Sequence, residues 1–359
     1  MKRCLWIGPG LFLLVLAGVR AQQTAPATPP APPQSGQPAQ TEPPQQAPPQ
    51  AAIVRNVNLV DVLYTVVNRH QKLVTDLNKE DFRVFDDNTE QLISSFSQPT
   101  DLPLRIGMVL DTSNSIRGRL QFEQDAAIEF LFSALRRNID QAFLMTFDDG
   151  SQLIEPFTGD TNALRDVIQK QRAGGGTALY DAVYAASDLL LTKSPLPRGP
   201  NSDIRRVLVV ISDGEDNSSN RSRGQAVEMA QRAGVIVYSI SSSTQWVDTS
   251  DERDPEKRIQ RKFEKTEGDH VLEQMAGETG GRSFFPYRVD DLGQAFLDIS
   301  DELRHQYALA YNPPGRTADG KFHTIRIQVN RKDVTVRARK GYFAVQTPLP
   351  TMPPAPVAR

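Results

Sequence analysis

IGMVLDTSNS, residues 106–115, is the stretch that decides the fold of this 359-residue chain. Its first half, Ile106–Leu110, is an apolar run that is long enough for a buried strand and too short for a typical helix. The run breaks abruptly into five polar residues, Asp111–Ser115, which therefore lie at the carboxyl tip of the expected strand. Ligands bind at that edge in open α/β sheets, so this turn is the first candidate for a functional site.

The region around this stretch, residues 101–306, alternates between apolar strands and helical segments. Its strands are apolar throughout, as expected for strands buried on both faces, and this predicts a doubly wound, mainly parallel α/β sheet. Between them, the charged segment 244–268 indicates an exposed loop. The expected strands are 105–110, 142–147, 152–157, 206–212, 235–241 and 283–287, and the expected helices are 119–137, 162–171, 178–191, 223–233, 270–278 and 292–304.

Two further segments carry oxygen ligands where a strand or loop ends. Thr177 follows Gly174–Gly176 and begins a helix, and the glycines let the backbone approach a ligand closely. Asp213 stands at the tip of the strand 206–212. Because the tips of a doubly wound sheet face one edge, five side chains could converge on one cation: Asp111, Ser113, Ser115, Thr177 and Asp213.

The residue types of this set suit a small hard cation. Mg²⁺ takes six oxygen ligands in near-octahedral geometry and keeps waters readily. The serine and threonine hydroxyls are neutral, and if Asp111 and Asp213 act mostly through water, the ion is under-neutralised. Such an ion attracts an anionic oxygen from outside. The set therefore predicts an adhesive contact with an Asp or Glu carboxylate of a protein partner rather than a catalytic site.

Three motifs, Asp-x-Ser-x-Ser at 111–115, Gly-Gly-Thr at 175–177 and Ser-Asp-Gly at 212–214, resemble the von Willebrand factor type A (vWA) domain. The metal-ion-dependent adhesion site (MIDAS) of that family is built from these three segments. The resemblance covers residues 101–306 and implies a Rossmann-like domain that binds Mg²⁺ or Mn²⁺ and a protein ligand. It also implies direct coordination by Ser113, Ser115 and sometimes Thr177, with Asp111 and Asp213 acting largely through water.

This chain departs from the integrin-type vWA domains just after the first motif. Ile116-Arg117-Gly118-Arg119 stand where those domains place acidic ligands for an adjacent second metal. The resemblance therefore implies one metal at this edge, and a second metal is not expected.

The β-rich flanks predict a second, smaller domain. Residues 51–99 contain about three strands, too few for an independent domain, and residues 307–345 contain three more. We expect these flanks to form one β-sandwich-like domain into which the central region is inserted; the alternative is two small β elements packed separately on it. Leu77–Glu90 and Arg339–Phe343 are similar to a largely acidobacterial group of exported proteins with vWA-related domains.

The chain termini indicate export. Lys2, Arg3, the apolar run that follows and Val19-Arg20-Ala21 predict a signal peptide over residues 1–21, with an uncleaved anchor as the alternative. Residues 22–50 are rich in Pro and Gln, and 346–359 are rich in Pro, so we expect a disordered linker and tail. The prediction is an exported protein that is periplasmic, secreted or on the cell surface, without a membrane span after signal cleavage.

Charge and cysteine usage exclude several function classes. A formal net charge of −2 offers no broad attraction to nucleic acid or to an anionic membrane. The single cysteine, Cys4, lies in the predicted signal, so the mature chain has no disulfide, thiolate zinc site or thiol nucleophile. No Gly-Lys-Ser/Thr follows Gly174–Gly176, which argues against a nucleotide P-loop.

The main alternative function is a metal-dependent hydrolase or phosphotransferase that uses Asp111 as its nucleophile. That chemistry needs a nearby acid or base and a cationic phosphate clamp, for which Arg117 and Arg119 are the candidates. The four histidines, at 70, 270, 305 and 323, form no hydrolase pattern with a serine. The other acids near the motifs have simpler explanations as turn, helix-supporting or solvated rim residues: Asp148, Asp149, Asp181, Glu215 and Asp216. We therefore predict a binding module and not an enzyme.

Overall fold

The computed structural model describes residues 59–98, 102–197, 203–243, 245–248, 261–286, 289–313 and 319–344. All of them belong to one unit of the chain, Arg55–Arg359. The predicted signal peptide, linker and Pro-rich tail lie outside the described residues. Among the helices of the described part, none is both long and apolar enough to cross a membrane.

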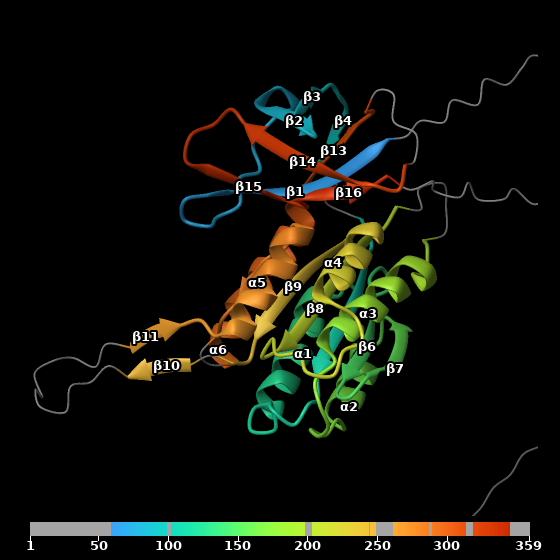
Figure 1. Ribbon diagram of the computed structural model, residues 1–359, viewed down its shortest axis with the longest axis vertical. Coiled ribbons are helices and arrows are strands. Elements are labelled where there is room, and N and C mark those ends of the chain that lie inside the picture. The colour runs from blue at the N-terminus through green and yellow to red at the C-terminus, as the bar shows by residue number, and fades with distance from the viewer. Residues whose placement is uncertain are drawn as a thin grey trace, which may run out of the picture. The chain divides into compact units, whose positions relative to one another are not determined.

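The central region contains a six-stranded sheet with helices on both faces (Figure 1). Its strands, in chain order, are β5 (Leu104–Asp111), β6 (Gln141–Phe147), β7 (Ser151–Thr158), β8 (Arg205–Ser212), β9 (Val235–Ser241) and β12 (Ser283–Phe284). They are arranged as β12-β9-β8-β5-β6-β7, and all neighbours pair in parallel except the edge strand β7. The predicted doubly wound, mainly parallel α/β fold is confirmed.

This strand order determines where a ligand can bind. The first strand of the sheet, β5, lies between β6 and β8, so the chain winds outward in opposite directions from β5. Crevices form where the winding direction changes, outside the carboxyl ends of the strands. Asp111 ends β5 and Asp213 follows β8, so both predicted acidic residues lie at this switch point.

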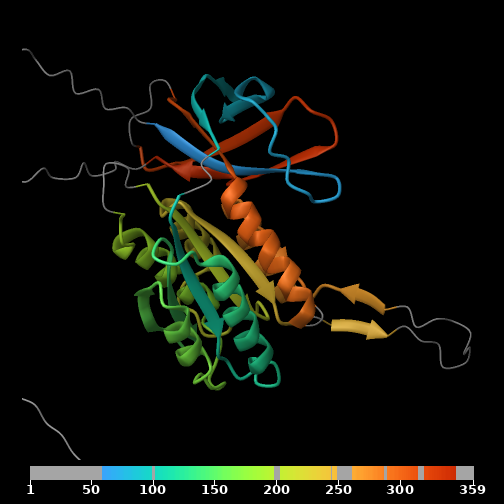
Figure 2. The same ribbon diagram turned by 180° about the vertical axis from the view of Figure 1, so that it is seen from behind.

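Six helices cover the sheet, three on each face. Ile106, Met108 and Leu110 of β5 share a core with α1 (Leu120–Ala134), α2 (Thr161–Ile168) and α6 (Val289–His305); Figure 2 shows α1 and α6 over this face. Val109 points to the opposite core, which includes α3 (Leu179–Lys193), α4 (Arg223–Arg232) and α5 (Glu267–Thr279). Because side chains alternate between the two faces of a strand, both faces of β5 are buried, and its middle, Ile106–Leu110, is an unbroken apolar run.

Residues 244–268 differ from the predicted loop. β10 (Gln245–Asp248) and β11 (Arg261–Glu264) pair as an antiparallel hairpin. The base of the hairpin is tied to Asp269, whose carboxylate accepts hydrogen bonds from Ser243 Oγ (2.7 Å) and the Thr266 backbone N–H (2.8 Å). Thr266 caps α5, which begins three residues earlier than predicted.

The N-terminal and C-terminal β-rich flanks together form two four-stranded sheets, and each sheet contains strands from both flanks. β1 (Val60–Asn68) pairs with β13 (Tyr307–Tyr311) and β15 (Val334–Ala338), and β13 also pairs with β4 (Ile93–Ser97). The other sheet has the order β16-β14-β2-β3, from β16 (Gly341–Phe343), β14 (Phe322–Val329), β2 (Phe82–Asp86) and β3 (Thr89–Gln91), with the short 3₁₀ helix η1 (Lys79–Asp81) before β2. Side chains of both sheets form one core. The exact domain bounds stay a prediction.

Helices α5 and α6 contact this β-rich region through specific polar groups. Glu302 on α6 is nearly fully buried and accepts hydrogen bonds from Thr65 Oγ1 (3.1 Å) and Arg337 Nη2 (2.9 Å). The backbone N–H of Lys340 donates to the carbonyl of Glu278 on α5 (3.1 Å). Because Glu302 is buried and accepts hydrogen bonds from two donors, one of them charged, it fixes α6 to the β-rich region.

Candidate metal centre

The turn after β5 holds its carboxylate and hydroxyls in fixed positions. Asp111 is completely buried. Its Oδ1 accepts a hydrogen bond from the backbone N–H of Ser113 (2.8 Å), and its Oδ2 accepts one from Ser212 Oγ at the end of β8 (2.6 Å). The hydroxyl oxygens of Ser113 and Ser115 lie 2.9 Å apart and form a hydrogen bond with each other.

The glycine loop lies directly against this turn. The backbone N–H of Gly174 donates to the carbonyl of Thr112 (2.8 Å), and that of Asn114 donates to the carbonyl of Gly175 (3.2 Å). Asp149 Oδ1 accepts a hydrogen bond from Gly176 N–H (2.7 Å). A Cβ on Gly176 would lie only 2.1 Å from Ser218 Oγ, so the close packing of the loops requires glycine there.

Thr177 is held by a reciprocal pair of hydrogen bonds with Asn217. The backbone N–H of Thr177 donates to Asn217 Oδ1, and the Asn217 N–H donates to the Thr177 carbonyl, both at 2.9 Å. Ser218 N–H donates to the same carbonyl (3.0 Å). The loop that follows β8 therefore positions the second predicted segment, and Thr177 itself is 2% exposed.

Asp213 begins the loop after β8 and is half-buried. Its Oδ1 accepts a hydrogen bond from the Glu215 N–H (3.2 Å). The next residue, Gly214, has a φ of +80°, and a Cβ there would lie 2.2 Å from the carbonyl oxygen of Gly268. A left-handed residue in so close an approach must be glycine, which explains the Asp-Gly pair at this position.

Two acids near the site have roles that differ from the sequence-based expectation. Asp181 accepts hydrogen bonds from the N–H groups of Asn220 (3.0 Å) and Arg221 (3.1 Å), so it fixes the loop after β8 and not only its own helix. Asp216 is not simply a solvated rim residue, because it accepts from Tyr180 N–H at the start of α3 (3.0 Å) and from Ser219 Oγ (2.6 Å).

The electrostatics of the site favour a cation. Burial raises the pKa of Asp111 to about 6, and the negative charge of Asp213 adds to this effect, against the hydrogen bonds from Ser212 and Ser113 that lower the pKa. Burial of a carboxylate disfavours its charged form unless an opposite charge is close. A divalent cation beside Asp111 and Asp213 would supply that charge.

Glu123 is a residue of this site that the sequence reasoning missed. It lies in the first turn of α1 and is fully buried, and neither carboxylate oxygen has a partner of standard hydrogen-bond geometry within the described residues, although the nearby Ser242 hydroxyl acts on it. Burial raises its pKa well above the ordinary value, and the charges of Asp111 and Asp213 raise it further. The signal was available, because Glu123 stands four and seven residues before Ala127 and Phe130, on the apolar face of the helix.

The residues present fit a hard divalent cation. Every candidate ligand atom is an oxygen, the Ser113 and Ser115 hydroxyls lie next to each other, and the charges of Asp111 and Asp213 act on the buried Glu123 carboxylate. Oxygen ligands of this kind suit Mg²⁺ or Mn²⁺. The ion would be held by the hydroxyls of Ser113, Ser115 and Thr177 with the carboxylates of Asp111 and Asp213, and it would supply positive charge and an open coordination position.

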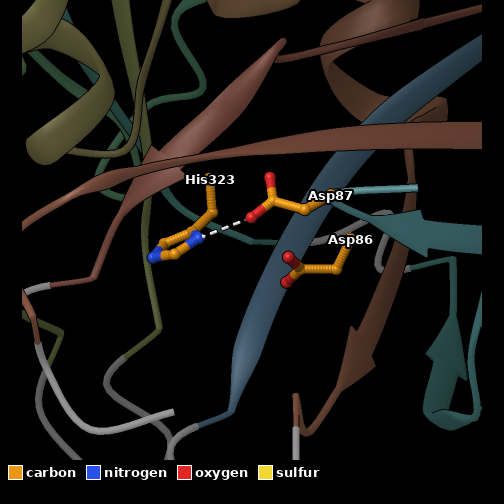
Figure 3. Close-up of side chains that lie close together, drawn as sticks. All are labelled: Asp86, Asp87 and His323. Atoms are coloured by element: carbon orange, nitrogen blue, oxygen red, sulfur yellow. Dashed lines mark hydrogen bonds and ion pairs between the residues drawn. The ribbon is translucent and has the colours of Figure 1, made fainter. Parts of the chain in front are cut away.

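A separate group of possible ligand atoms lies in the β-rich region, where Asp86, Asp87 and His323 place one atom each within 4.8 Å of one another (Figure 3). His323 Nδ1 is 2.9 Å from Asp87 Oδ2, and its Nε2 is 3.2 Å from Asp319 Oδ1. Asp86 Oδ2 accepts hydrogen bonds from the hydroxyls of Tyr311 and Tyr342. These groups join the turn after β2 to β14, and we interpret them as a clamp within the β-rich region.

Comparison with protein families identifies the type of domain in the central region. Residues 106–215 match the family model of the von Willebrand factor type A domain, so the predicted resemblance is confirmed for the segment that carries all five candidate ligands. The matched segment begins with β5 and ends just after Asp213.

Individual relatives are distant. An uncharacterized protein of Borreliella burgdorferi is 25% identical over 243 residues, which cover 64% of this chain and 62% of that protein. A UPF0353 protein of Mycolicibacterium vanbaalenii is 23% identical over 212 residues, 55% of this chain and 60% of that protein. The chain thus spans about three fifths of the length of these curated relatives.

Among solved structures, a von Willebrand factor type A protein from Catenulispora acidiphila superimposes with a TM-score of 0.43. It is 10% identical, and the superposition covers 79% of this chain and 72% of that one.

Proposed function

Because residues 106–215 form a von Willebrand factor type A domain, we propose that this protein is a metal-dependent binding module that holds an acidic group of a protein partner through a divalent cation. The observation that supports this proposal most is that hydrogen bonds join the three motif segments, which are far apart in the sequence. Ser212 holds Asp111, Gly174 and Gly175 bond to the turn after β5, and Asn217 holds Thr177.

The exposure of the ligands favours binding of a partner from solvent. Asp111, Ser113 and Thr177 are buried, whereas Asn114 and Ser115 are exposed beside them. The buried groups would fix the cation, and the exposed side would leave a coordination position for an incoming oxygen. A partner carboxylate is the best such ligand, because it adds negative charge to an ion that neutral hydroxyls leave under-neutralised. We propose Mg²⁺ as the resident ion, with Mn²⁺ as a substitute of the same ligand preference.

The chemistry of the site favours binding over hydrolysis. Both oxygens of Asp111 accept hydrogen bonds from Ser113 and Ser212, which reduces its capacity to attack a substrate. Arg117 and Arg119 are exposed, and Glu123, the acid closest to a catalytic role, is fully buried and out of reach of a substrate. We therefore propose that the protein is not an enzyme and acts as an exported adhesion or scaffold module.

Calorimetry with Mg²⁺ and Mn²⁺ tests the metal site. We expect the Asp111→Ala variant to stay folded and to lose binding of both ions, because the buried carboxylate of the site is gone. Asp188→Ala, which removes an exposed aspartate from α3, is the matched control and should bind as the wild type does. Unchanged metal affinity in folded Asp111→Ala would refute the site assignment.

A second measurement tests binding against catalysis. Envelope proteins of the parent organism are passed over immobilised wild type and Asp111→Ala, with Mg²⁺ or with EDTA, and retained proteins are treated with a carboxylate-amidating reagent before a second passage. We expect retention that needs Mg²⁺, Asp111 and unmodified carboxylates. Mg²⁺-dependent hydrolysis of p-nitrophenyl phosphate that disappears in Asp111→Asn would instead establish a hydrolase.

A further inference from the structure

The buried carboxylate of Glu123 requires an explanation that its surroundings in the fold do not supply. It is fully buried, neither oxygen has a partner of standard hydrogen-bond geometry in the described part of the chain, and the Ser242 hydroxyl is the uncharged donor that acts on it. Buried polar side chains in native proteins nearly always have partners, and an orphaned one often indicates a missing ion or water. A glutamate retained only for packing would be replaced at no loss by an apolar residue of similar volume.

Glu123 lies in the buried first turn of α1, the helix that follows β5 and packs against it, and Asp111 ends β5. Asp111 and Asp213 are the acids whose charges act on it, and the side chain beside it is Ser242. Ser242 donates its backbone N–H to the carbonyl of Ser212 (3.0 Å), the residue whose hydroxyl holds Asp111. The Ser242 hydroxyl is also buried, and the Glu123 carboxylate is the acceptor that it faces.

The charges around this point are unbalanced. Three acids, Asp111, Asp213 and Glu123, act on one another, and the basic group that acts on Glu123 is Arg119, whose side chain belongs to an exposed residue. Like charges in a buried region oppose ionisation unless a cation compensates them. A divalent ion bound beside Asp111 and Asp213 would supply positive charge that acts on all three acids.

Resting on the metal site proposed above, we propose that Glu123 is a positioning residue of that site, whose carboxylate strengthens divalent-cation binding from the buried side and is in turn stabilised by the bound cation. The five motif residues are then assisted by a sixth, on α1. Because such coupling is reciprocal, the bound ion also stabilises the first turn of α1 against the sheet.

The test compares Glu123→Gln with wild type by calorimetry with Mg²⁺ and Mn²⁺, and by thermal unfolding in EDTA and in saturating Mg²⁺. Glutamine keeps the volume and removes the charge. We expect the affinity for both ions to fall about tenfold, the usual range for a residue that supports metal ligands. In EDTA, the variant should unfold at or above the wild-type temperature. Glu129→Gln, which removes the same charge from the exposed side of α1, should leave the affinity unchanged.

The outcome separates this inference from the proposed function. Metal affinity within twofold of wild type in Glu123→Gln, with binding lost in Asp111→Ala, would overturn the role of Glu123 and leave the metal site standing. Retained binding in Asp111→Ala would overturn the site itself. If Glu123→Gln does not fold, Glu123→Met is measured in its place, since it conserves volume in an apolar surrounding; tenfold weaker binding there supports the role, and unchanged binding overturns it.

Discussion

The Asp111→Asn variant should be more stable than the wild type without metal and less stable with it. In the metal-free protein, burial raises the pKa of Asp111 from 3.8 to about 6. At 1.36 kcal/mol per pH unit, the ionised carboxylate costs about 3 kcal/mol of folding free energy at pH 7. Asparagine removes this cost and keeps an oxygen for the Ser113 N–H, while its altered contact with Ser212 costs about 1 kcal/mol. The net gain is roughly 2 kcal/mol.

The pH dependence has a definite sign. The folded-state pKa lies above the ordinary value, so the folded metal-free protein binds this proton more tightly than the unfolded chain does. The free-energy cost of the buried Asp111 charge is absent below pH 4, grows as the pH rises towards 6, and reaches its full value above pH 6. The advantage of Asp111→Asn should therefore be largest at pH 7.5 and should disappear near pH 4. Protons compete with the cation in the same range, so Mg²⁺ affinity of the wild type should fall as the pH drops below 6.

Thermal unfolding in EDTA and in Mg²⁺, at pH 4.5, 6 and 7.5, measures both effects. At roughly 2–4 °C per kcal/mol for a chain of this size, the metal-free variant should melt several degrees above the wild type at pH 7.5. Mg²⁺ at about 100 times its dissociation constant should stabilise the wild type by about 2.7 kcal/mol and the variant not at all, which reverses their order. A metal-free variant that is less stable than the wild type at pH 7.5 would refute the reasoning.

Three further changes test how the site is built. Asn217→Ala leaves the buried Thr177 N–H without its acceptor, so we expect a loss of about 1–3 kcal/mol in chemical denaturation and weaker Mg²⁺ binding by calorimetry. Gly176→Ala should weaken metal binding because its Cβ would meet Ser218 Oγ, whereas Gly174→Ala, which meets nothing within 4 Å, is the control and should bind normally. His323→Gln should lower the melting temperature, because it removes the paired contacts to Asp87 and Asp319, and should leave Mg²⁺ affinity unchanged.

Much of the fold could be predicted from the sequence because its signals are local and strong. The strands β5 and β8 contain the unbroken apolar runs Ile106–Leu110 and Val207–Ile211, which are too short for most helices. The β10–β11 hairpin was missed because it is a backbone ladder in a charged segment, where no alternation of apolar residues marks the strands. The predicted start of α5 was three residues late, because its capping residues, Thr266 and Asp269, lie at the edge of the charged segment that was predicted to be a loop.

The candidate ligands could be predicted, but their supports could not. Asp111, Thr177 and Asp213 stand in motifs at strand and loop ends, where residue type and position carry the information. The links through Ser212 and Asn217 depend on how two loops approach in space. No pattern along the chain encodes that approach, although the glycines at 176 and 214 indicate that something packs closely there.

The contacts that hold the ligand segments are separate from those that attach the β-rich region, so metal affinity and stability should respond to different substitutions. Each ligand segment is held by bonds to the other two, and the loops meet over a sheet edge whose strands are buried on both faces. The β-rich region is attached to α6 through Glu302. Helix α6 in turn packs against α1 through Phe296 and Phe130, whose ring centroids lie 5.4 Å apart. Packing of this kind transmits a change only if it has two discrete arrangements. We therefore expect substitutions in the β-rich region to alter stability, and substitutions in the three loops to alter metal affinity.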